Sequence, residues 1–341
     1  MHLAGANFGS GLAHIGQGQL SRWKNIILQG TGVGNRILTE LEFVAWKTRD
    51  LHQFFLQLGN DIYQDYQVQE FCIIGSQALS ILRSIPIRYV KEASSDNTVR
   101  TSAGNLNFNY IPVTPVAKSF KLTVTSLLNL TKKRLDNRLV SDSYYDYDLS
   151  YLSKLRQAIP FAIAYDTAHS GKDIRIVSGK NNRRAILPLI KSALTTPYQP
   201  KAYEKAAERF NRMTHRIFER VALLSNSLLE WDKQSQYDAH AQLIFRIRDQ
   251  FDNAVEDFDI LRTMEFNKCG KHWRNSLADI APVNIEISGT ESESDEIAYL
   301  PLTMGLSNDE LMTVIEGFKT TIIDITLLRL PSDEVFKIEK T

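Results

Sequence analysis

The feature that most constrains the fold is a long amphipathic segment at residues 201–232. Its apolar residues recur every three or four positions, as they do along one face of an α-helix. They are Tyr203, Ala206, Phe210, Met213, Ile217, Val221, Leu224, Leu228 and Trp231. Pro200 stands immediately before the segment, where a proline is tolerated. The pattern predicts a single helix of about eight or nine turns.

A second periodic segment follows after the short polar link KQSQ. Between about Tyr237 and Phe266 the same spacing is kept by Ala241, Ile244, Ile247, Phe251, Val255, Phe258 and Leu261. Two long helices joined by a short link are expected to form an antiparallel hairpin. We therefore predict a mainly α protein with a minor β component (α+β), built on a long antiparallel helical hairpin and arranged in two lobes.

The length of 341 residues is enough for two domains or for one large domain. Residues 283–288 and 320–330 have the pattern of strands, and Ser307 or Asn308, followed by Glu310, predicts the start of a helix. The expected segments are a glycine-rich N-terminal arm (1–20), a mixed N-terminal lobe (21–117), a basic mixed segment (118–200), the helical hairpin (201–268) and an acidic C-terminal α+β segment (269–341).

The net charge of +1 hides a strong asymmetry along the chain. Residues 118–220 contain 20 Lys and Arg against 9 Asp and Glu, whereas residues 221–341 contain 11 against 22. Such asymmetry points to a nucleic-acid partner or to association between unlike surfaces. The alternative is that the two segments lie side by side and neutralise each other.

The predicted helix from residue 201 carries a row of cations on one face. Lys201, Lys205, Arg209, Arg212, Arg216 and Arg220 are spaced three or four residues apart. A row of cations about 5.4 Å apart suits a phosphate backbone, because it displaces several counterions at once. A protein partner and a solvated face are the alternatives.

Two basic turns, 131–138 and 178–184, extend this charge, since glycine and asparagine beside cations let the backbone approach a phosphate. The candidate nucleic-acid-binding residues are therefore Lys132, Lys133, Arg134, Lys180, Arg183, Arg184, Lys205, Arg209, Arg212, Arg216 and Arg220.

The second predicted helix carries the opposite charge. Asp249, Asp252, Glu256 and Asp259 would lie on one face and repel one another unless something cationic covers them. The basic helix of a neighbouring copy, the basic turn at 180–184 or a divalent metal ion would each do so.

The segment NIILQGTGVGNRIL, residues 25–38, has alternating glycines between two apolar runs. A dinucleotide-binding loop has the pattern G-x-G-x-x-G, but Asn35 occupies the position of the third glycine. No Lys-Ser/Thr pair follows, so the segment is not a phosphate-binding P-loop. We interpret it as a glycine-rich bend, with nucleotide binding as the alternative.

The searches for catalytic and metal motifs give only weak matches. The serine of GSQ (75–77) is not framed by G-x-S-x-G, the pattern of a nucleophile elbow. Cys269 and His272 form half of a zinc site without a second pair. We therefore expect no catalytic residue, no cofactor and no metal site.

The N-terminus lacks a basic start and a continuous apolar stretch, so we expect no secretory signal. No apolar run reaches the length of a spanning helix, and two cysteines cannot build a disulfide framework. These features predict a soluble, cytoplasmic protein.

Together these patterns predict a non-enzymatic, multi-copy protein that binds RNA or single-stranded nucleic acid by neutralising phosphates. Its copies would associate basic face to acidic face, and the glycine-rich arm would latch onto a neighbour. One alternative is a structural subunit of a virion, tail or secretion machine without nucleic-acid contact. Another is an enzyme that binds a nucleotide at residues 25–38.

Overall fold

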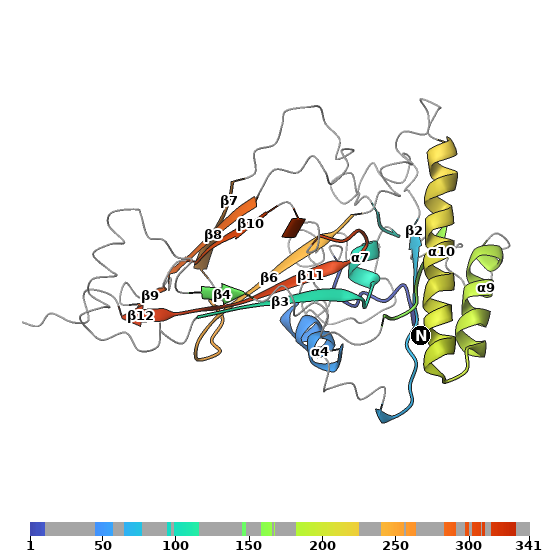
Figure 1. Ribbon diagram of the computed structural model, residues 1–341, viewed down its shortest axis with the longest axis horizontal. Coiled ribbons are helices and arrows are strands. Elements are labelled where there is room, and N and C mark those ends of the chain that lie inside the picture. The colour runs from blue at the N-terminus through green and yellow to red at the C-terminus, as the bar shows by residue number, and fades with distance from the viewer. Residues whose placement is uncertain are drawn as a thin grey trace, which may run out of the picture. The chain divides into compact units, whose positions relative to one another are not determined.

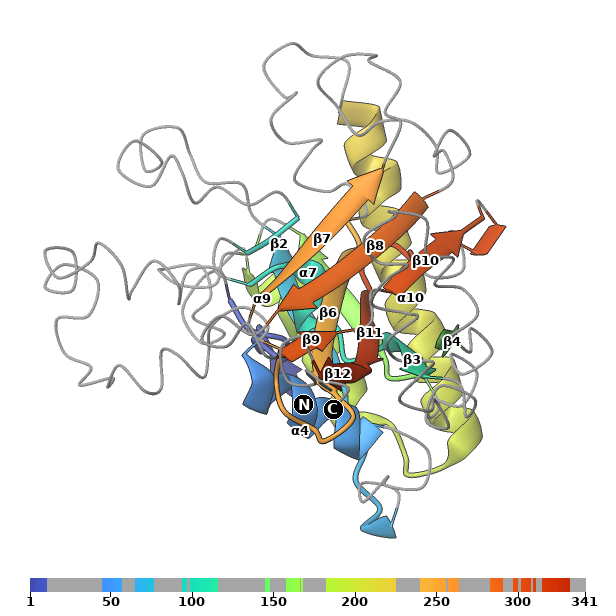
Figure 2. The same ribbon diagram turned by 90° about the vertical axis from the view of Figure 1, so that its left-hand side faces the viewer.

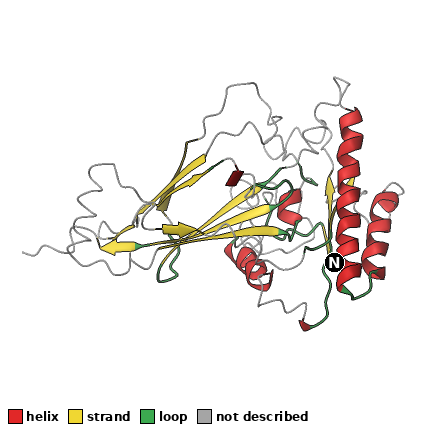
Figure 3. Ribbon diagram, in the orientation of Figure 1, coloured by secondary structure: helices red, strands yellow, loops and turns green. Residues whose placement is uncertain are grey.

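We describe a computed structural model of the chain, in which strands hold more residues than helices (Figures 1 and 3). The residues that the structure describes are 1–10, 45–56, 65–76, 94–96, 99–115, 145–147, 158–165, 167, 182–224, 240–255, 257–263, 283–290, 297–299, 302–307, 309–310 and 315–331.

The chain divides into two compact units, each made of segments far apart in the sequence. Unit 1 comprises Met1–Phe108, Lys154–Gln242 and Gly317–Thr320. Unit 2 comprises Asn109–Ser153, Leu243–Glu316 and Thr321–Thr341.

Unit 1 contains a parallel three-stranded sheet in the order β1-β2-β5. The strands are β1 (His2–Leu3), β2 (Cys72–Ser76) and β5 (Phe161–Tyr165). All five residues of β2 are buried, as expected for a parallel strand that is covered on both faces. An apolar run without alternation, CIIGS, is the sequence signature of such a strand.

Two helices cover one face of this sheet: α9 (Asn182–Thr195) and α10 (Pro200–Leu224). Figure 1 shows them side by side, and both contact β5. Alternate strand residues and one face of each helix share a core, made of Phe71, Ile73, Ala162, Ala164, Ile186, Leu189, Ala193, Ala206 and Phe210. The hydroxyl of Thr214 on α10 also accepts the N–H of Ile163 at 3.1 Å.

Unit 1 also contains α4 (Trp46–Leu56) and the short α7 (Thr101–Gly104). Residues 1–10, the first half of the expected glycine-rich arm, are packed on their own chain. Phe8 is fully buried and its ring contacts His52 and Phe108.

The described part of unit 2 contains strands from two sheets. The first sheet has the order β4-β3-β11-β6. Its strands are β3 (Phe108–Pro115), β4 (Tyr145–Tyr147), β6 (Gln242–Asp249) and β11 (Thr320–Leu327), of which Phe108, Gln242 and Thr320 belong to unit 1.

The second sheet of unit 2 has the order β10-β8-β9-β12, and β7 also pairs with β8. Its strands are β7 (Asp257–Thr263), β8 (Val283–Thr290), β9 (Ile297–Tyr299), β10 (Leu302–Leu306) and β12 (Arg329–Pro331). Strand β8 pairs antiparallel with β7, β9 and β10, and β9 pairs antiparallel with β12. Figure 2 shows β7, β8 and β10 side by side.

The predicted mainly α fold with a helical hairpin is wrong: the protein is an α/β protein. The helix expected from residue 201 is present as α10, but its expected partner over 237–266 forms β6 and β7. The carboxylate of Asp249 accepts the N–H groups of Phe251 and Asn253, each at 2.8 Å, and Asp252 adopts φ 67°. This tight turn is incompatible with a continuous helix over residues 237–266. The spacing of apolar residues gives no sign of the turn.

The predicted strands at 283–288 and 320–330 are confirmed as β8, β11 and β12. The cap at Ser307 is also confirmed. Its hydroxyl accepts the N–H of Glu310 at 3.3 Å, and the Glu310 carboxylate accepts the N–H of Ser307 at 2.9 Å. This reciprocal pair is a capping box.

Candidate functional site

The carboxyl ends of β2 and β5 lie side by side in unit 1. The parallel register places Ser76, the last residue of β2, opposite Tyr165, the last residue of β5. Ser76 is buried and follows a glycine. In open α/β sheets, ligands bind outside the carboxyl ends of the strands, so this edge is the first place to look for chemistry.

Three segments meet at Gly75, next to Ser76: the end of β2, the residue Thr167 after β5 and the turn that contains Asp96. A methyl group placed on Gly75 would lie 2.1 Å from the carbonyl oxygen of Thr167 and 3.2 Å from Cβ of Asp96. Any side chain larger than hydrogen would therefore collide with the backbone of Thr167. The absence of a side chain at residue 75 allows Thr167 and Asp96 to pack directly against the strand end that carries Ser76.

Asp96 is held rigidly in a buried turn. Its Oδ1 accepts the N–H of Val99 at 2.8 Å, and its own N–H donates to the Val99 carbonyl at 3.1 Å. The turn is closed by the N–H of Thr101, which donates to the carbonyl of Ser94 at 2.8 Å. Asp96 is fully buried as a result. A buried carboxyl group is normally hydrogen-bonded or paired with a charge of the opposite sign.

A glycine-containing loop follows β1 at the same edge of the sheet. The N–H of Ala4 donates to Ile73 at 2.8 Å, and the N–H of Phe8 donates to Ala103 at 3.0 Å. Between these anchors, the N–H groups of Gly5, Ala6 and Asn7 make no hydrogen bond to any described residue. Adjacent unpaired N–H groups are the donors that stabilise an oxyanion.

Three of the groups that nucleophilic catalysis uses lie at this edge: a serine after a glycine at a strand end, a fixed carboxyl and backbone donors on the neighbouring loop. Ser76 has ordinary strand geometry, since it is not among the residues with positive φ. It is 1% exposed.

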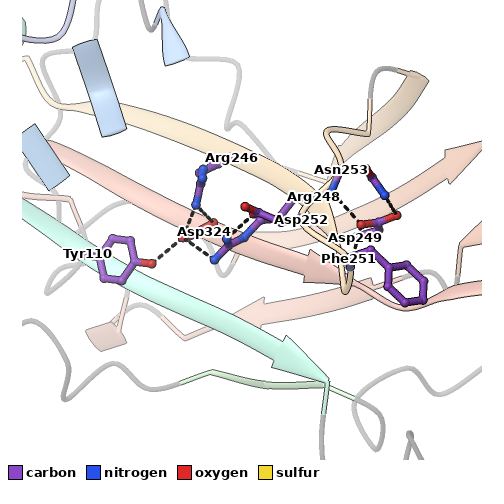
Figure 4. Close-up of polar contacts among 8 residues, drawn as sticks. All are labelled: Tyr110, Arg246, Arg248, Asp249, Phe251, Asp252, Asn253 and Asp324. Atoms are coloured by element: carbon purple, nitrogen blue, oxygen red, sulfur yellow. Dashed lines mark hydrogen bonds and ion pairs between the residues drawn. The ribbon is translucent and has the colours of Figure 1, made fainter. Parts of the chain in front are cut away.

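A second polar cluster lies on the first sheet of unit 2 (Figure 4). The buried carboxylate of Asp324 on β11 accepts the hydroxyl of Tyr110 at 2.5 Å. It also accepts Arg246 at 3.1 Å and Arg248 at 3.4 Å, both from β6. Arg248 in turn pairs with Asp252 at 2.5 Å. Because two arginines meet two carboxylates, the cluster carries no excess charge, and it joins β3, β11 and β6.

The structure places only some of the predicted nucleic-acid-binding residues. Lys205, Arg209 and Arg212 are exposed on α10. Arg209 donates to Ser192 of α9 at 3.1 Å, and Arg212 pairs with Glu208 at 3.5 Å. The backbones of Arg183 and Arg184 belong to α9, and those of Arg216 and Arg220 belong to α10. Lys132, Lys133, Arg134 and Lys180 lie outside the described residues.

The predicted acidic face does not exist, because its residues do not share a helix. Asp249 ends β6 and is buried, where it accepts hydrogen bonds from the following turn. Asp252 lies in that turn, and Asp259 lies on β7. Among the described residues, no group of three or more His, Cys, Asp or Glu side chains could hold a metal ion.

The predictions for the glycine loop at 25–38 and for Cys269 and His272 fall on residues that the structure does not describe. So does the turn at 131–138. Within the described part of the chain, no helix combines the length and apolar character needed to cross a membrane. The cytoplasmic location and the association of copies stay predictions.

Sequence reasoning missed Ser76 and Asp96 because it required G-x-S-x-G. Ile74 and Ala78 occupy the two glycine positions of that pattern. The signal that was present is a fully apolar strand ending in Gly-Ser, which fits the nucleophile position at the end of a buried strand. Nothing in the sequence alone distinguishes Asp96 from the other aspartates.

The sequence matches no protein-family model and no curated protein. The structure is similar to that of phospholipase PlaB from Legionella pneumophila, with a TM-score of 0.67 and 18% sequence identity. The match covers 99% of this chain and 72% of that chain. The same phospholipase in complex with thio-NAD matches with a TM-score of 0.67 and 17% identity, over the same shares of the two chains.

This likeness concerns the fold, and it overturns the functional expectations from the sequence. A non-enzymatic, nucleic-acid-binding assembly protein was expected, whereas the fold is shared with an α/β phospholipase. The physical reason for the error is that the basic row of α10 was interpreted without knowing what the helix packs on. The outer face of a helix that covers a sheet is often charged simply because it is solvated.

Proposed function

We propose that this protein is a serine hydrolase that cleaves carboxylic esters of phospholipids, with Ser76 as the nucleophile. The observation that carries the proposal is the position of Ser76. It ends a buried parallel strand, and Gly75 lets Asp96 and Thr167 pack against that strand end. The similarity in fold to a protein described as a phospholipase supports the choice of a lipid ester.

Asp96 is proposed as the acid of the triad and His169 as its base. In α/β hydrolases the three residues follow in the order serine, acid, histidine, and Ser76, Asp96 and His169 have this order. His169 lies outside the described residues and is chosen from the sequence, because it stands two positions after Thr167. The described histidines after Asp96 are His215, exposed on α10, and His240.

The proposed reaction has two steps. The Ser76 hydroxyl attacks the ester carbonyl while His169 takes its proton, and the alcohol leaves with that proton. Water then attacks the acyl-enzyme with His169 again as base, which releases the fatty acid and restores Ser76. Asp96 would hold the imidazole in place, and the N–H groups of residues 5–7 would stabilise the oxyanion.

Labelling with a fluorophosphonate probe and release of fatty acid from phosphatidylglycerol vesicles test the proposal. The wild-type protein should react, and Ser76→Ala should lose labelling and at least about 10³-fold in hydrolysis rate. Asp96→Asn and His169→Ala should be similarly impaired. Ser192→Ala, at another buried serine of unit 1, should keep full fluorophosphonate labelling. A wild-type protein that neither labels nor hydrolyses any ester would overturn the proposal.

A further inference from the structure

The outer faces of α9 and α10 lie in one layer of unit 1. Both helices bury their opposite faces in the same core against the sheet, through residues such as Leu189 and Phe210. The hydrogen bond from Arg209 to the buried Ser192 fixes the two helices against each other. The two helices also lie side by side (Figure 1), so their faces turned away from the sheet adjoin.

The α9 side of this surface is apolar with one cation in it. Leu187 and Leu194 are 43% and 75% exposed, and seven residues apart they lie on the same face of the helix. Tyr198, just after the helix, is 46% exposed. Lys191 stands between the two leucines along that face and is also exposed. Large exposed apolar side chains that gather on one face mark an interaction surface.

The α10 side is cationic. Lys201, Lys205, Arg209 and Arg212 are exposed, against the exposed Glu204 and Glu208. Glu208 is paired with Arg212. Lys191, Lys201 and Lys205 form no ion pair with any described residue. This surface therefore offers three ammonium groups that pair with no described carboxylate, beside three exposed apolar side chains.

We propose that this surface, formed by Leu187, Lys191, Leu194, Tyr198, Lys201 and Lys205, docks on an anionic lipid bilayer. Apolar side chains next to lysines are typical of helices that lie in a membrane interface. The leucines insert between head groups, and the lysines meet lipid phosphates. A nucleic-acid backbone would use the lysines but would leave the leucines without a partner. The inference rests on the proposed function, because an enzyme that cleaves phospholipids must remain at their surface.

Co-sedimentation of the full chain with vesicles tests this proposal, with Ser76→Ala as the background so that no lipid is consumed. Binding is expected to vesicles containing phosphatidylglycerol, to be weaker on pure phosphatidylcholine, and to fall with added salt. Each lysine near an anionic bilayer contributes roughly a fivefold factor in binding. The triple variant Lys191→Glu, Lys201→Glu, Lys205→Glu should therefore bind at least about 50-fold more weakly.

Three further variants separate the contributions. Leu187→Ser with Leu194→Ser should weaken binding at least about tenfold, whereas Glu204→Lys should strengthen it. The matched control, Leu51→Ser with Phe54→Ser, removes exposed apolar side chains from α4 and should bind as the parent does. Unchanged vesicle binding by both the triple lysine and the double leucine variants would overturn the inference. So would binding to a random oligonucleotide in place of vesicles.

Hydrolysis of a short-chain soluble ester separates this inference from the proposed function. The surface variants, with Ser76 restored, should hydrolyse the soluble ester at the wild-type rate and lose activity only on vesicles. If they retain activity on vesicles as well, the docking surface is wrong and the hydrolase assignment stands. If the wild-type protein binds vesicles but hydrolyses no ester, the hydrolase assignment is wrong and the surface stands.

Discussion

The side chain of Asn7 donates a buried hydrogen bond of 2.9 Å to the carbonyl of Gly104, 97 residues further along the chain. The loop after β1 is thereby fastened to α7, next to the turn that holds Asp96. Gly104 also packs tightly, since a methyl group there would lie 2.5 Å from the end of the Ile74 side chain. The hydrogen bond between Asn7 and Gly104 thus connects the loop of the proposed oxyanion donors to α7, which lies next to the proposed acid and the strand that carries Ser76.

Asn7→Ala should lower kcat for a soluble ester about tenfold or more with little change in KM, because oxyanion donors act in the transition state. Leaving the Gly104 carbonyl unpaired should cost about 1–3 kcal/mol of stability. Steady-state kinetics and urea unfolding measure the two effects. A loss of stability with unchanged kcat would show that the hydrogen bond between Asn7 and Gly104 has only a structural role.

Gly75→Ala should be severely disruptive, because the added methyl group would meet backbone atoms of Thr167, which cannot rotate away. We expect a loss of about 1–3 kcal/mol or more in the free energy of unfolding, together with loss of fluorophosphonate labelling. Gly104→Ala is the matched comparison. Its methyl group meets the flexible end of Ile74, so its effect on stability should be smaller. Equal effects of the two substitutions would contradict this account of Gly75.

His52 should make the protein less stable in acid. Burial and the nearby His2 lower the pKa of His52 to about 4, although the charge of Glu70 acts to raise it. Glu70 itself accepts a 3.0 Å hydrogen bond from His2. An unfolded histidine has a pKa of about 6.5. Between these values the unfolded chain binds a proton that the folded chain does not, so stability falls as the pH drops from about 6.5 to about 4.

The loss that this group causes should reach at most about 3 kcal/mol, and it should level off below about pH 4. Urea unfolding of the wild type and of His52→Gln at pH 7 and pH 4.5 measures it. The variant should lose less stability between the two pH values. Identical losses would show that His52 does not stay neutral in the folded protein.

Tyr110→Phe should destabilise the first sheet of unit 2 by about 1.5–3 kcal/mol, because it removes a hydrogen bond to the buried charge of Asp324. Burial, and then the charge and the hydrogen bond of Asp324, raise the pKa of Tyr110 well above its usual value. Above about pH 10 the unfolded chain loses this proton first, so the wild type should lose stability there more steeply than the variant. Chemical unfolding at pH 8 and pH 10.5 compares them, and parallel losses would contradict the assignment.

The elements that could be predicted from the sequence are those whose signal is local. The apolar spacing of residues 201–224 specifies α10, because an amphipathic helix buries its apolar face regardless of which element it packs against. Ser307 and Glu310 specify their cap within a single turn. The alternation of residues 283–288 specifies β8, and the β-branched run from residue 320 specifies β11.

The remaining elements and the candidate site depend on contacts between distant parts of the chain. Residues 242–249 satisfy a helical spacing, but they form β6 because β11, some 70 residues away in the chain, is their hydrogen-bonding neighbour. Ser76 and Asp96 are ordinary residues in the sequence. They become a candidate site because parallel pairing brings the ends of β2 and β5 together and Gly75 leaves room for the turn at Asp96. The spacing of apolar residues reports only the local conformation of a segment. It therefore does not show which distant segment will lie beside it.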